Sequence, residues 1–410
     1  MPARLQITLG LMGLCAVFAS SFFLFGYQNT WQFFSLNPVT PPFADSCTIT
    51  YGAESAKQGY DPMICNPADP WERKMNYPRI WQLLYKLGLT KEHTNVFGIL
   101  LFLSYIGGIV LFIPEKLNMK SQIIILISSF SPAALSGIER GNTDLLLFFI
   151  VSLCIVLLCS KKRYHKVASY LVLIFGFLLK LFPIFGLAIY LKEQKKILRA
   201  ILLFTILFCS SYSVLFYHDL CLIKAATPVT YRGTYGMSTL GLAASEIDRN
   251  LGRMINLLSI LLLILGSGAT VYFIRTRKLH INEIYSNNLD AFRVGSSIFL
   301  GTFLLGTNYS YRLIFLIFTL PQLVEWIEAD FPVFSLNSKI ALTAILFSLW
   351  GNLAIQAMNG IFVLKATVFL VIKLSHGLTF CSLILLFVAS VPNQLRNISH
   401  NYFSIVSLKS

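Results

Sequence analysis

The chain has 410 residues, of which 56% are hydrophobic, 14% aromatic and only 12% charged. In soluble domains about a quarter of the residues are charged, so this composition excludes an ordinary globular domain, a disordered tail and a coiled coil. Eight cysteines are few for this length, which excludes a disulfide-dense secreted module. The 33 Lys and Arg exceed the 18 Asp and Glu by 15. In a membrane protein this excess indicates cytoplasmic loops that face anionic lipid, and it does not require a nucleic-acid partner.

The first apolar run extends from Leu5 to about Gly26 and is long enough to cross about 30 Å of hydrocarbon. It lacks the basic start and the small-residue cleavage site of a secretory signal peptide. We therefore interpret it as an uncleaved first span, which places residues 27–93 in the first loop. Positive and negative charges cancel in this loop, so an extracytoplasmic position agrees with the positive-inside rule.

The loop 27–93 contains Asp-Pro, Asn-Pro and Tyr-Pro pairs. Such pairs fix turns, so we predict a loop of definite shape and not a flexible linker. Residues 80–87 are predicted to form an amphipathic helix that lies in the membrane interface, with Trp81, Leu84 and Leu87 on one face.

Further apolar runs predict nine more spans, at about 94–113, 122–138, 144–159, 200–217, 255–274, 291–307, 313–326, 340–358 and 367–390. With the first run they make about ten crossings in a single integral membrane domain over 1–410, an all-α polytopic fold. Three basic connections lie on one side of the membrane if the N-terminus is cytoplasmic. They contain Lys116 and Lys120; Lys161, Lys162, Arg163 and Lys166; and Arg275, Arg277 and Lys278.

The apolar segment 167–191 does not fit a simple crossing, because basic clusters flank both of its ends. The second of these clusters contains Lys192, Lys195, Lys196 and Arg199. The middle of the segment contains Lys180 and Pro183. A charge and a proline within hydrocarbon length favour a broken or re-entrant hairpin whose apex lines a cavity. We expect Lys180 at that apex, accessible from the outer side.

A short turn between two predicted spans, 139–144, has the sequence Glu-Arg-Gly-Asn-Thr-Asp. In a structural interpretation, Asp144 favours the dipole of the following helix and Glu139 pairs with Arg140. In a functional interpretation, the turn binds an anion or a sugar, and Arg140 contacts a phosphate. Both interpretations place ionisable groups where they are costly, at the edge of the bilayer.

Two further cations lie at membrane-embedded or outer positions. Lys180 either contacts a phosphate or pairs with a buried acid. Arg312 follows Asn308 and Tyr311 at the outer end of two spans, where the aromatic residues could also form an interfacial belt. A phosphate contact is the functional alternative for Arg312.

The remaining signals are weaker. The second outer loop, 218–253, carries Gly and Tyr residues over 230–236, which suit a mobile cover over a sugar site. Lys365 and Lys373 are expected to snorkel to the interface. Cys47 and Cys65 lie eighteen residues apart in the first loop, so they either form an extracytoplasmic disulfide or remain free thiols.

Several of these features follow one another in order over residues 5–190: the first span; a loop with an early Asp, a Gly-x-Asp-Pro element and Asn-Tyr-Pro; an Arg-Gly-Asn-x-Asp turn; and Gly-Phe-Leu-Leu-Lys-Leu-Phe-Pro. Together they resemble the polyprenyl-phosphate-sugar-dependent glycosyltransferases of the GT-C superfamily, nearest glycosyltransferase family 87. The segment 308–322 is similar to a later segment of such proteins. The resemblance implies a GT-C-like helical bundle in the bacterial plasma membrane, with an extracytoplasmic active site.

The resemblance also implies a reaction. A sugar, for example the hexose mannose, passes with inversion from a polyprenyl-phosphate donor to a hydroxyl of a lipid-linked or cell-envelope glycan acceptor. In this family a loop Asp is the base, and Asp45 matches best as the first acid after the first span, with Asp61 and Asp69 as rivals. The chemistry itself requires a carboxylate for the acceptor proton and cations for the departing phosphate.

The predicted site follows from these two arguments. The donor phosphate is expected to contact Arg140, Lys180 and Arg312. Sugar or acceptor contacts are expected from Glu139, Asn142, Asp144, Tyr77, Asn308 and Tyr311. Nucleotide-binding glycine motifs and His/Cys metal spacings are absent from the sequence, and we expect neither a metal nor another cofactor.

A membrane transporter or flippase of a lipid-linked or anionic substrate is the alternative function. Such a protein would also place charges and broken helices at mid-membrane. A transporter should show a second interrupted segment in the other half of the chain, and the sequence shows one clear break.

Overall fold

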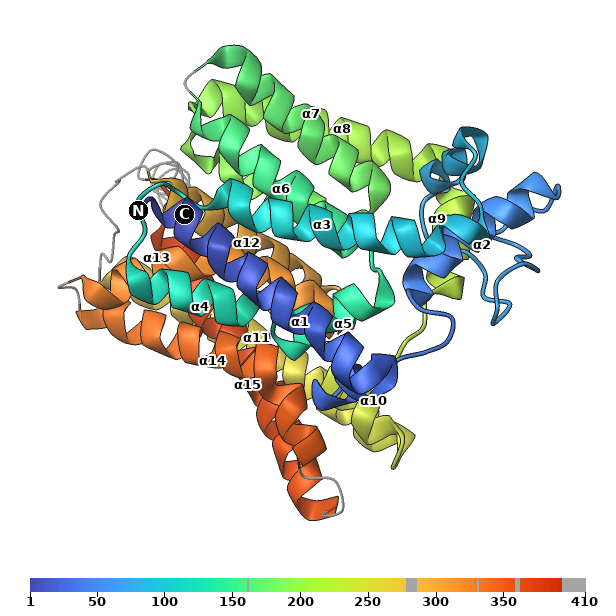
Figure 1. The fold of residues 1–410 in the computed structure, drawn as a ribbon. Helices are drawn as coiled ribbons and strands as arrows, with labels where there is room; N and C mark the ends of the chain where they lie inside the picture. The colour runs from blue at the N-terminus through green and yellow to red at the C-terminus, as the bar shows by residue number, and fades with distance from the viewer. Residues whose placement is uncertain (161, 278–285, 330–331, 358–361, 393–410) are drawn as a thin grey trace.

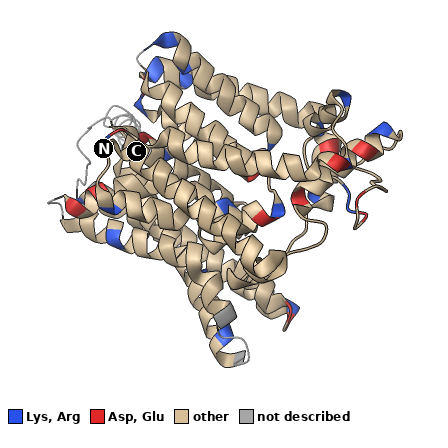
Figure 2. Cartoon of the chain, viewed as in Figure 1, with Lys and Arg blue, Asp and Glu red and all other residues tan. Residues whose placement is uncertain are grey.

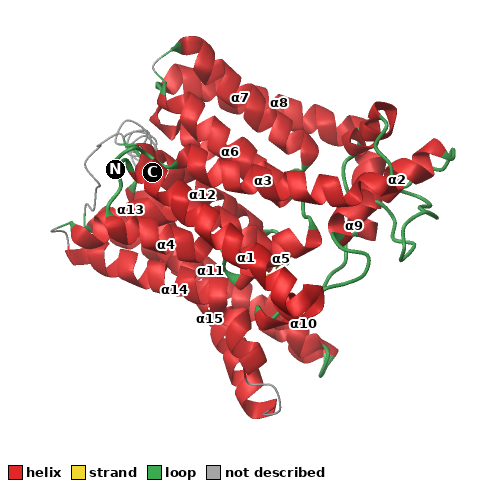
Figure 3. Cartoon of the chain, in the orientation of Figure 1, coloured by secondary structure: helices red, strands yellow, loops and turns green. Residues whose placement is uncertain are grey.

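The computed structural model describes residues 1–160, 162–277, 286–329, 332–357 and 362–392 (Figure 1). About 79% of it is helical (Figure 3). Lys161 and Lys278, which were named above, and Met358, the last residue of the predicted span 340–358, lie outside the described residues.

Residues 3–215 form helices joined by turns. In chain order they are α1 (Ala3–Phe33), α2 (Ala44–Lys57), the 3-10 helices η1 (Arg79–Leu87) and η2 (Lys91–His93), α3 (Thr94–Phe112), α4 (Met119–Ser129), α5 (Pro132–Arg140), α6 (Asp144–Cys159), α7 (Arg163–Leu179), the 3-10 helix η3 (Phe182–Lys192) and α8 (Lys195–Leu215).

The second part of the chain adds more helices and two very short strands. They are α9 (Tyr217–Ala226), β1 (Thr234–Tyr235), α10 (Thr239–Ser245), α11 (Arg249–Thr276), α12 (Asn287–Leu304), β2 (Asn308–Tyr309), the 3-10 helix η4 (Ser310–Thr319), α13 (Leu320–Glu328), α14 (Pro332–Ala357) and α15 (Phe362–Ala389). The strands β1 and β2 pair antiparallel.

Seven helices in the described part are long and apolar enough to cross a membrane, and an eighth span results if the bent pair α4 and α5 counts as one. Large apolar side chains on α1, α8 and α11 are exposed, which is the expected surface toward lipid tails. The chain is therefore an all-α, multi-pass membrane protein. The predicted total of ten remains a prediction, because further apolar segments such as α6 are shorter.

The centre of the molecule is the continuous segment formed by η4 and α13, which packs against α5, α12 and α14. Its aromatic residues are buried, and Phe318 stacks on Phe148 of α6 with ring centroids 4.3 Å apart. The predicted span 313–326 is therefore enclosed by protein on most sides. The first residues of η4, among them Tyr311 and Arg312, belong to the site described below.

The predicted span 122–138 is not one continuous helix. The chain bends by 44° between α4 and α5. Ser131 and Pro132 start the second helix, since Pro132 occupies the first turn and the Ser131 hydroxyl accepts a hydrogen bond from the Ala134 amide. The sequence shows one clear break, at Lys180 and Pro183, and this bend is a second break in the described residues.

The segment 167–191 forms the expected broken hairpin. Helix α7 ends at Leu179, and η3 starts at Phe182 and packs back against α7. At the open end of the hairpin, the Lys166 ammonium donates to the Glu193 carboxylate at 2.7 Å. Both flanks of the segment thus lie at the same end of the bundle, with Lys180 at the opposite, closed end.

The basic flanks lie at the same end of the bundle as the N-terminus. The Ala3 amide donates to the Glu115 carbonyl at 3.0 Å, and Lys192 pairs with Asp290 at the start of α12. Figure 2 shows that charged residues gather at helix ends, while most of the helical surface between them carries neither sign. This arrangement agrees with the positive-inside pattern, and the orientation itself stays a prediction.

The first loop differs from the predicted segment 27–93 in two ways. Helix α1 continues past a kink at Gly26 (φ 77°, ψ 170°) as far as Phe33. The loop also contains α2, which the sequence analysis did not predict. The predicted interfacial helix is η1, and its expected common face is wrong, since Trp81 is 4% exposed whereas Leu87 is 81% exposed.

The second loop, 218–253, is more structured than the sequence analysis expected. It contains α9, β1 and α10, and α11 begins within it. The Ser310 amide donates to the Gly233 carbonyl at 2.9 Å, which extends the contact between β1 and β2. The predicted snorkelling of Lys373 is wrong, because this side chain is buried and donates to the Thr234 carbonyl.

Candidate functional site

Asp45 lies in the first turn of α2, where a carboxylate favours the helix dipole. A close approach fixes this helix start against the turn after α5. Gly141 has φ 57°, and a Cβ built on it would lie 2.5 Å from the Ser46 Oγ. The Ser46 hydroxyl donates to the Gly141 carbonyl at 2.7 Å. Glycine is required here both for its backbone conformation and for the short distance.

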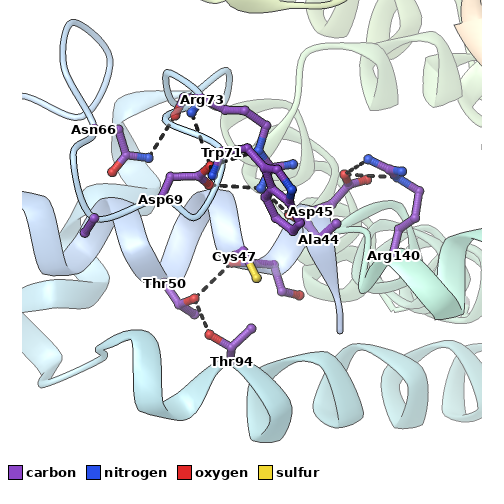
Figure 4. Close-up of polar contacts among 12 residues, drawn as sticks. Ala44, Asp45, Cys47, Thr50, Asn66, Asp69, Trp71, Arg73, Thr94 and Arg140 are labelled. Carbon is purple, nitrogen blue, oxygen red and sulfur yellow. Dashed lines mark hydrogen bonds and ion pairs between the residues drawn. The ribbon is translucent and has the colours of Figure 1, made fainter. Parts of the chain in front are cut away.

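Asp45 is held by Arg140 and Asn142, the residues on either side of Gly141, and Figure 4 shows its contact with Arg140. The Arg140 guanidinium donates to Asp45 Oδ1 from Nε at 3.1 Å and from Nη2 at 2.6 Å. The Asn142 amide donates to Asp45 Oδ2 at 2.5 Å. Oδ1 accepts both hydrogen bonds from Arg140, whereas Oδ2 accepts one from Asn142 and keeps a lone pair that can still accept a proton or a hydrogen bond.

Asp144, at the first turn of α6, holds two cations. The Lys180 ammonium donates to Asp144 Oδ1 at 2.6 Å, and Arg312 Nε donates to Asp144 Oδ2 at 3.0 Å. The Asp144 side chain is 1% exposed, so its charge is compensated almost entirely by these two partners. Arg312 also donates to the Asn308 side-chain carbonyl.

The amide of Asn142 joins the two groups. Its nitrogen donates to Asp45, and its oxygen accepts from Lys180 at 3.3 Å. The network therefore runs without a gap from Arg140 through Asp45, Asn142 and Lys180 to the carboxylate of Asp144. One side chain separates the candidate base from the candidate phosphate cation.

The position of Lys180 depends on the break after α7. The Trp81 indole N–H donates to the Leu179 carbonyl at 2.9 Å, which satisfies a backbone acceptor at the end of the helix. Lys180 itself has extended backbone angles (φ −164°, ψ 131°), and this change of direction aims its side chain at Asn142 and Asp144. A residue of the first loop thus fixes the apex of the hairpin.

Aromatic rings surround the cations. Lys180 Nζ lies 5.2 Å from the centroid of the Tyr77 ring and 6.0 Å from that of Tyr311. The Arg312 guanidinium lies 4.2 Å from the Phe182 ring centroid. Burial, with the charges of Asp45 and Asp144 nearby, raises the pKa of Tyr77 well above its ordinary value. Its hydroxyl therefore stays protonated and remains a hydrogen-bond donor.

These residues border a cavity of about 360 Å³, called here the central cavity. Its charged lining residues are Asp45, Arg73, Lys74, Arg140, Lys180 and Arg312. Two further carboxylates lie behind this lining. Asp69 pairs with Arg73, and Asp144 pairs with both Lys180 and Arg312. Five cations against three carboxylates leave two positive charges in excess, so the cavity favours an anionic ligand.

Most of the predicted site residues meet at the central cavity. Its lining includes Asp45, Tyr77, Arg140, Lys180, Asn308, Tyr311 and Arg312. Asn142 and Asp144 contact lining residues from behind. Glu139 does not line this cavity and does not pair with Arg140; its carboxylate accepts a hydrogen bond from the Val39 amide at 3.3 Å.

The two rival carboxylates lie elsewhere in the first loop. Asp69 is buried and accepts from the Arg73 side chain at 2.9 Å, and Arg73 also donates to the Ala44 carbonyl at 2.7 Å. This pair supports the start of α2. Asp61 accepts from Arg79 at 3.1 Å. Among the described residues that line the central cavity, Asp45 is the one carboxylate.

Sequence reasoning missed several residues of the site. Arg73 and Lys74 line the cavity, and Thr143 accepts from Lys180 at 3.4 Å. The spacing of Asp69 and Arg73 is the one signal that could have indicated an ion pair, while Thr143 lies inside the motif that supplied its neighbours. Lys74 carries no such signal.

The two cysteines of the first loop are free thiols in the structure. Cys47 is buried in α2, and Cys65 is exposed. Of the two alternatives predicted for this pair, the structure shows the free thiols and not the disulfide. Asn66 fixes this part of the loop instead, because its side-chain oxygen accepts from the Ser55 hydroxyl and its amide donates to the Arg73 carbonyl.

Comparison with known proteins gave no match: no family model, no curated protein and no solved structure corresponds to this chain.

Proposed function

We propose that the protein is a glycosyltransferase that uses a polyprenyl-phosphate sugar and acts at the central cavity. The observation that carries this proposal is the contact of Asn142 with both Asp45 and Lys180. Glycosyl transfer requires a carboxylate and a phosphate-binding cation on opposite sides of one anomeric carbon. The central cavity offers this pair of groups.

In the proposed reaction, the acceptor hydroxyl oxygen attacks the anomeric carbon while the bond from that carbon to the phosphate oxygen breaks. Asp45 takes the hydroxyl proton. The phosphate changes from a singly charged diester to a monoester that carries about −1.5 to −2 charges at pH 7. The two excess positive charges around the cavity match the charge of the leaving group, so they stabilise the transition state more than the bound donor.

We propose the donor sugar, the acceptor, the stereochemistry and the membrane location from the family resemblance. The donor sugar is a hexose such as mannose, the acceptor is a lipid-linked or cell-envelope glycan, and the configuration inverts. The protein resides in the bacterial plasma membrane with its N-terminus in the cytoplasm. The central cavity then lies on the extracytoplasmic side, at the end of the bundle opposite the basic flanks.

The test uses purified protein in lipid nanodiscs with a polyprenyl-phosphate hexose and cell-envelope lipid acceptors. We expect a glycosylated product, no product with Asp45→Asn, and nearly unchanged donor binding to that variant. Asp61→Asn is the matched control, because it removes a loop carboxylate that does not line the central cavity. Equal loss of activity in both variants would exclude Asp45 as the specific base.

Transport of a lipid-linked anion is the second candidate, and the bend between α4 and α5 favours it. With the break at Lys180, the chain has two interrupted apolar segments, a feature of transporters with discontinuous helices, but both lie in the first half of the chain and not at corresponding positions of two halves. A transporter does not need the Asp45 carboxylate as a base. Retained substrate movement across liposomes by Asp45→Asn, with no product formed by the original protein, would establish transport instead.

A further inference from the structure

A second cavity of about 790 Å³ lies beside the central cavity and is called here the side cavity. Arg140 and Tyr309 line both cavities. Since Arg140 pairs with Asp45, this shared wall connects the side cavity to the candidate base. The volume lies within the range of small-molecule sites and is more than twice that of the central cavity.

The side cavity combines groups that suit a sugar. Its wall includes the rings of Tyr231, Tyr309 and Phe369, whose faces can cover the apolar face of a sugar ring. The amides of Asn37 and Asn352 can each donate and accept hydrogen bonds from sugar hydroxyls. A purely lipid-filled groove would not require this set of polar groups.

Glu139, the residue before Arg140, also lines the side cavity. Its side chain belongs to a residue that is 4% exposed, and the hydrogen bond from the Val39 amide uses one lone pair of Oε1. A carboxylate has about four lone-pair sites, so Glu139 can accept further hydrogen bonds from ligand hydroxyls. This position explains why Glu139 does not take part in the network around Asp45.

Arg232 gives the side cavity a local contact for an anion. Of the three cations in the lining, Arg140 is paired with Asp45, while Arg232 and Lys365 lie in the same wall as the carboxylate of Glu139. Arg232 is solvent-exposed, and its Nε donates to the Tyr231 hydroxyl at 3.1 Å. The Tyr231 hydroxyl donates in turn to Glu246 at 2.8 Å. This chain holds the guanidinium at the rim, where it can meet a charged substituent of a ligand.

We propose that the side cavity binds the acceptor, and that this acceptor is a glycan with a negatively charged substituent. The inference rests on the proposed function, because it assigns the second substrate of the same reaction. The sugar ring lies between the aromatic residues, its hydroxyls contact Glu139 and Asn352, and its anionic group contacts Arg232. The reacting hydroxyl reaches Asp45 past Arg140. A carboxylate of an acidic sugar and a phosphate ester share the chemistry that Arg232 recognises.

The test measures binding and turnover separately, with the full chain in nanodiscs. The probes are the octyl glycosides of mannose, mannose 6-phosphate and glucuronic acid. We expect the two anionic glycosides to bind at least tenfold more tightly than octyl mannoside. A preference for one of them identifies the source of the charge. Equal binding of all three, or no binding, overturns the proposal.

Variants then locate the binding site. Arg232→Gln and Asn352→Leu should each raise the Kd of the anionic glycoside and the acceptor KM at least fivefold, with donor KM and kcat nearly unchanged. Lys57→Gln is the control, since it removes an exposed cation at the end of α2 that lines neither cavity. A change in donor KM alone, or no change in either variant, contradicts an acceptor role of the side cavity.

The two proposals fail in different ways. If the protein binds the anionic glycosides through Arg232 but consumes no polyprenyl-phosphate sugar, the proposed reaction is wrong while the binding site stands. If it consumes the donor while Arg232→Gln and Asn352→Leu leave glycoside binding unchanged, the reaction stands and the acceptor site lies elsewhere. Thermal unfolding of each variant confirms that it is folded before either measurement.

Discussion

Asp45 and Arg140 form an ion pair of 2.6 Å between the first turn of α2 and the last turn of α5, although 95 residues separate them in the sequence. The pair exists because Gly141 permits α2 to approach. A Gly141→Ala change adds a Cβ 2.5 Å from the Ser46 Oγ and places a side chain at φ 57°. We expect a lower melting temperature and loss of most transferase activity.

The control for this change is Gly88→Ala. Gly88 also has a positive φ, 82°, but nothing lies within 4 Å of the added Cβ. The backbone cost of roughly 1–2 kcal/mol should be similar in both variants, so the additional effect of Gly141→Ala measures the close approach. Equal melting temperatures and equal activities would show that the contact between α2 and α5 does not matter.

Asp144 compensates two buried cations, so replacing it with Asn should destabilise the protein strongly. Asp144→Asn leaves Lys180 and Arg312 without their shared carboxylate, and breaking a buried pair of this kind costs about 3–5 kcal/mol. Denaturant unfolding in detergent micelles measures the effect. Glu328→Gln removes the carboxylate of an exposed pair with Lys120 and should leave the free energy of unfolding nearly unchanged, because solvent screens this pair. Equal changes in the free energy of unfolding for the two substitutions would contradict the role of Asp144 as the carboxylate that compensates Lys180 and Arg312.

Lys180 is expected to contribute to catalysis through its charge. Lys180→Gln should lower kcat by about 10²–10³, the usual loss when one preorganised donor to a developing negative charge is removed. Lys166→Gln, which removes a cation at the opposite end of the same hairpin, should leave kcat within a factor of about two or three. The measurement is the initial rate at saturating donor and acceptor. An unchanged kcat in Lys180→Gln would exclude a phosphate contact in the transition state.

The two loop cysteines should differ in reactivity. Cys65 is exposed, whereas burial raises the pKa of the Cys47 thiol to about 12. The thiolate is the reactive form, so a maleimide at pH 7.5 should label Cys65 within minutes and leave Cys47 unmodified until the protein unfolds. Peptide mass spectrometry under non-reducing conditions provides the measurement. A linked peptide that contains both cysteines would overturn this assignment.

The contact between the two outer loops should weaken in acid. Arg79 bonds to Asp219 at 2.8 Å and holds the pKa of this carboxyl below its ordinary value of about 3.9. A lowered folded-state pKa contributes stability above the unfolded value, and this contribution is lost as the pH falls through the folded value. Asp219→Asn should therefore reduce stability at pH 6 and flatten its decline below pH 4. Glu72→Gln, an exposed loop carboxylate, should keep the slope of the original protein.

Hydropathy was sufficient to predict the class of the fold. The predicted span 144–159 coincides with α6, and 94–113 differs from α3 by one residue. Long apolar runs have one stable solution in a bilayer, so composition determines their structure. Helix α2 was missed because its small and polar residues give no apolar period, and packing against α3, α5 and η1 stabilises it instead.

The site was predictable in part because charges within apolar sequence are rare. Lys180 and Arg312 stood out for this reason. The partners of these residues could not be derived, since contacts such as that of Arg312 with Asp144 join positions 168 residues apart. The assumed pairing of Glu139 with Arg140 used the nearest opposite charge in sequence. In the fold, Arg140 pairs with Asp45 and lines both cavities, whereas Glu139 accepts a hydrogen bond from the Val39 amide and lines the side cavity alone.

The short ladder between β1 and β2 couples the outer loop to the cation cluster. Asn308 pairs with Tyr235 across the ladder, and the same residue holds the Arg312 guanidinium through its side chain. A lid that swings freely could not keep these contacts, so lifting β1 away would also release one support of Arg312. Movement of the loop and the position of the Arg312 guanidinium are thus coupled through Asn308. A substitution at Tyr235 that disturbs the ladder would therefore change the position of Arg312 without a direct contact between the two residues.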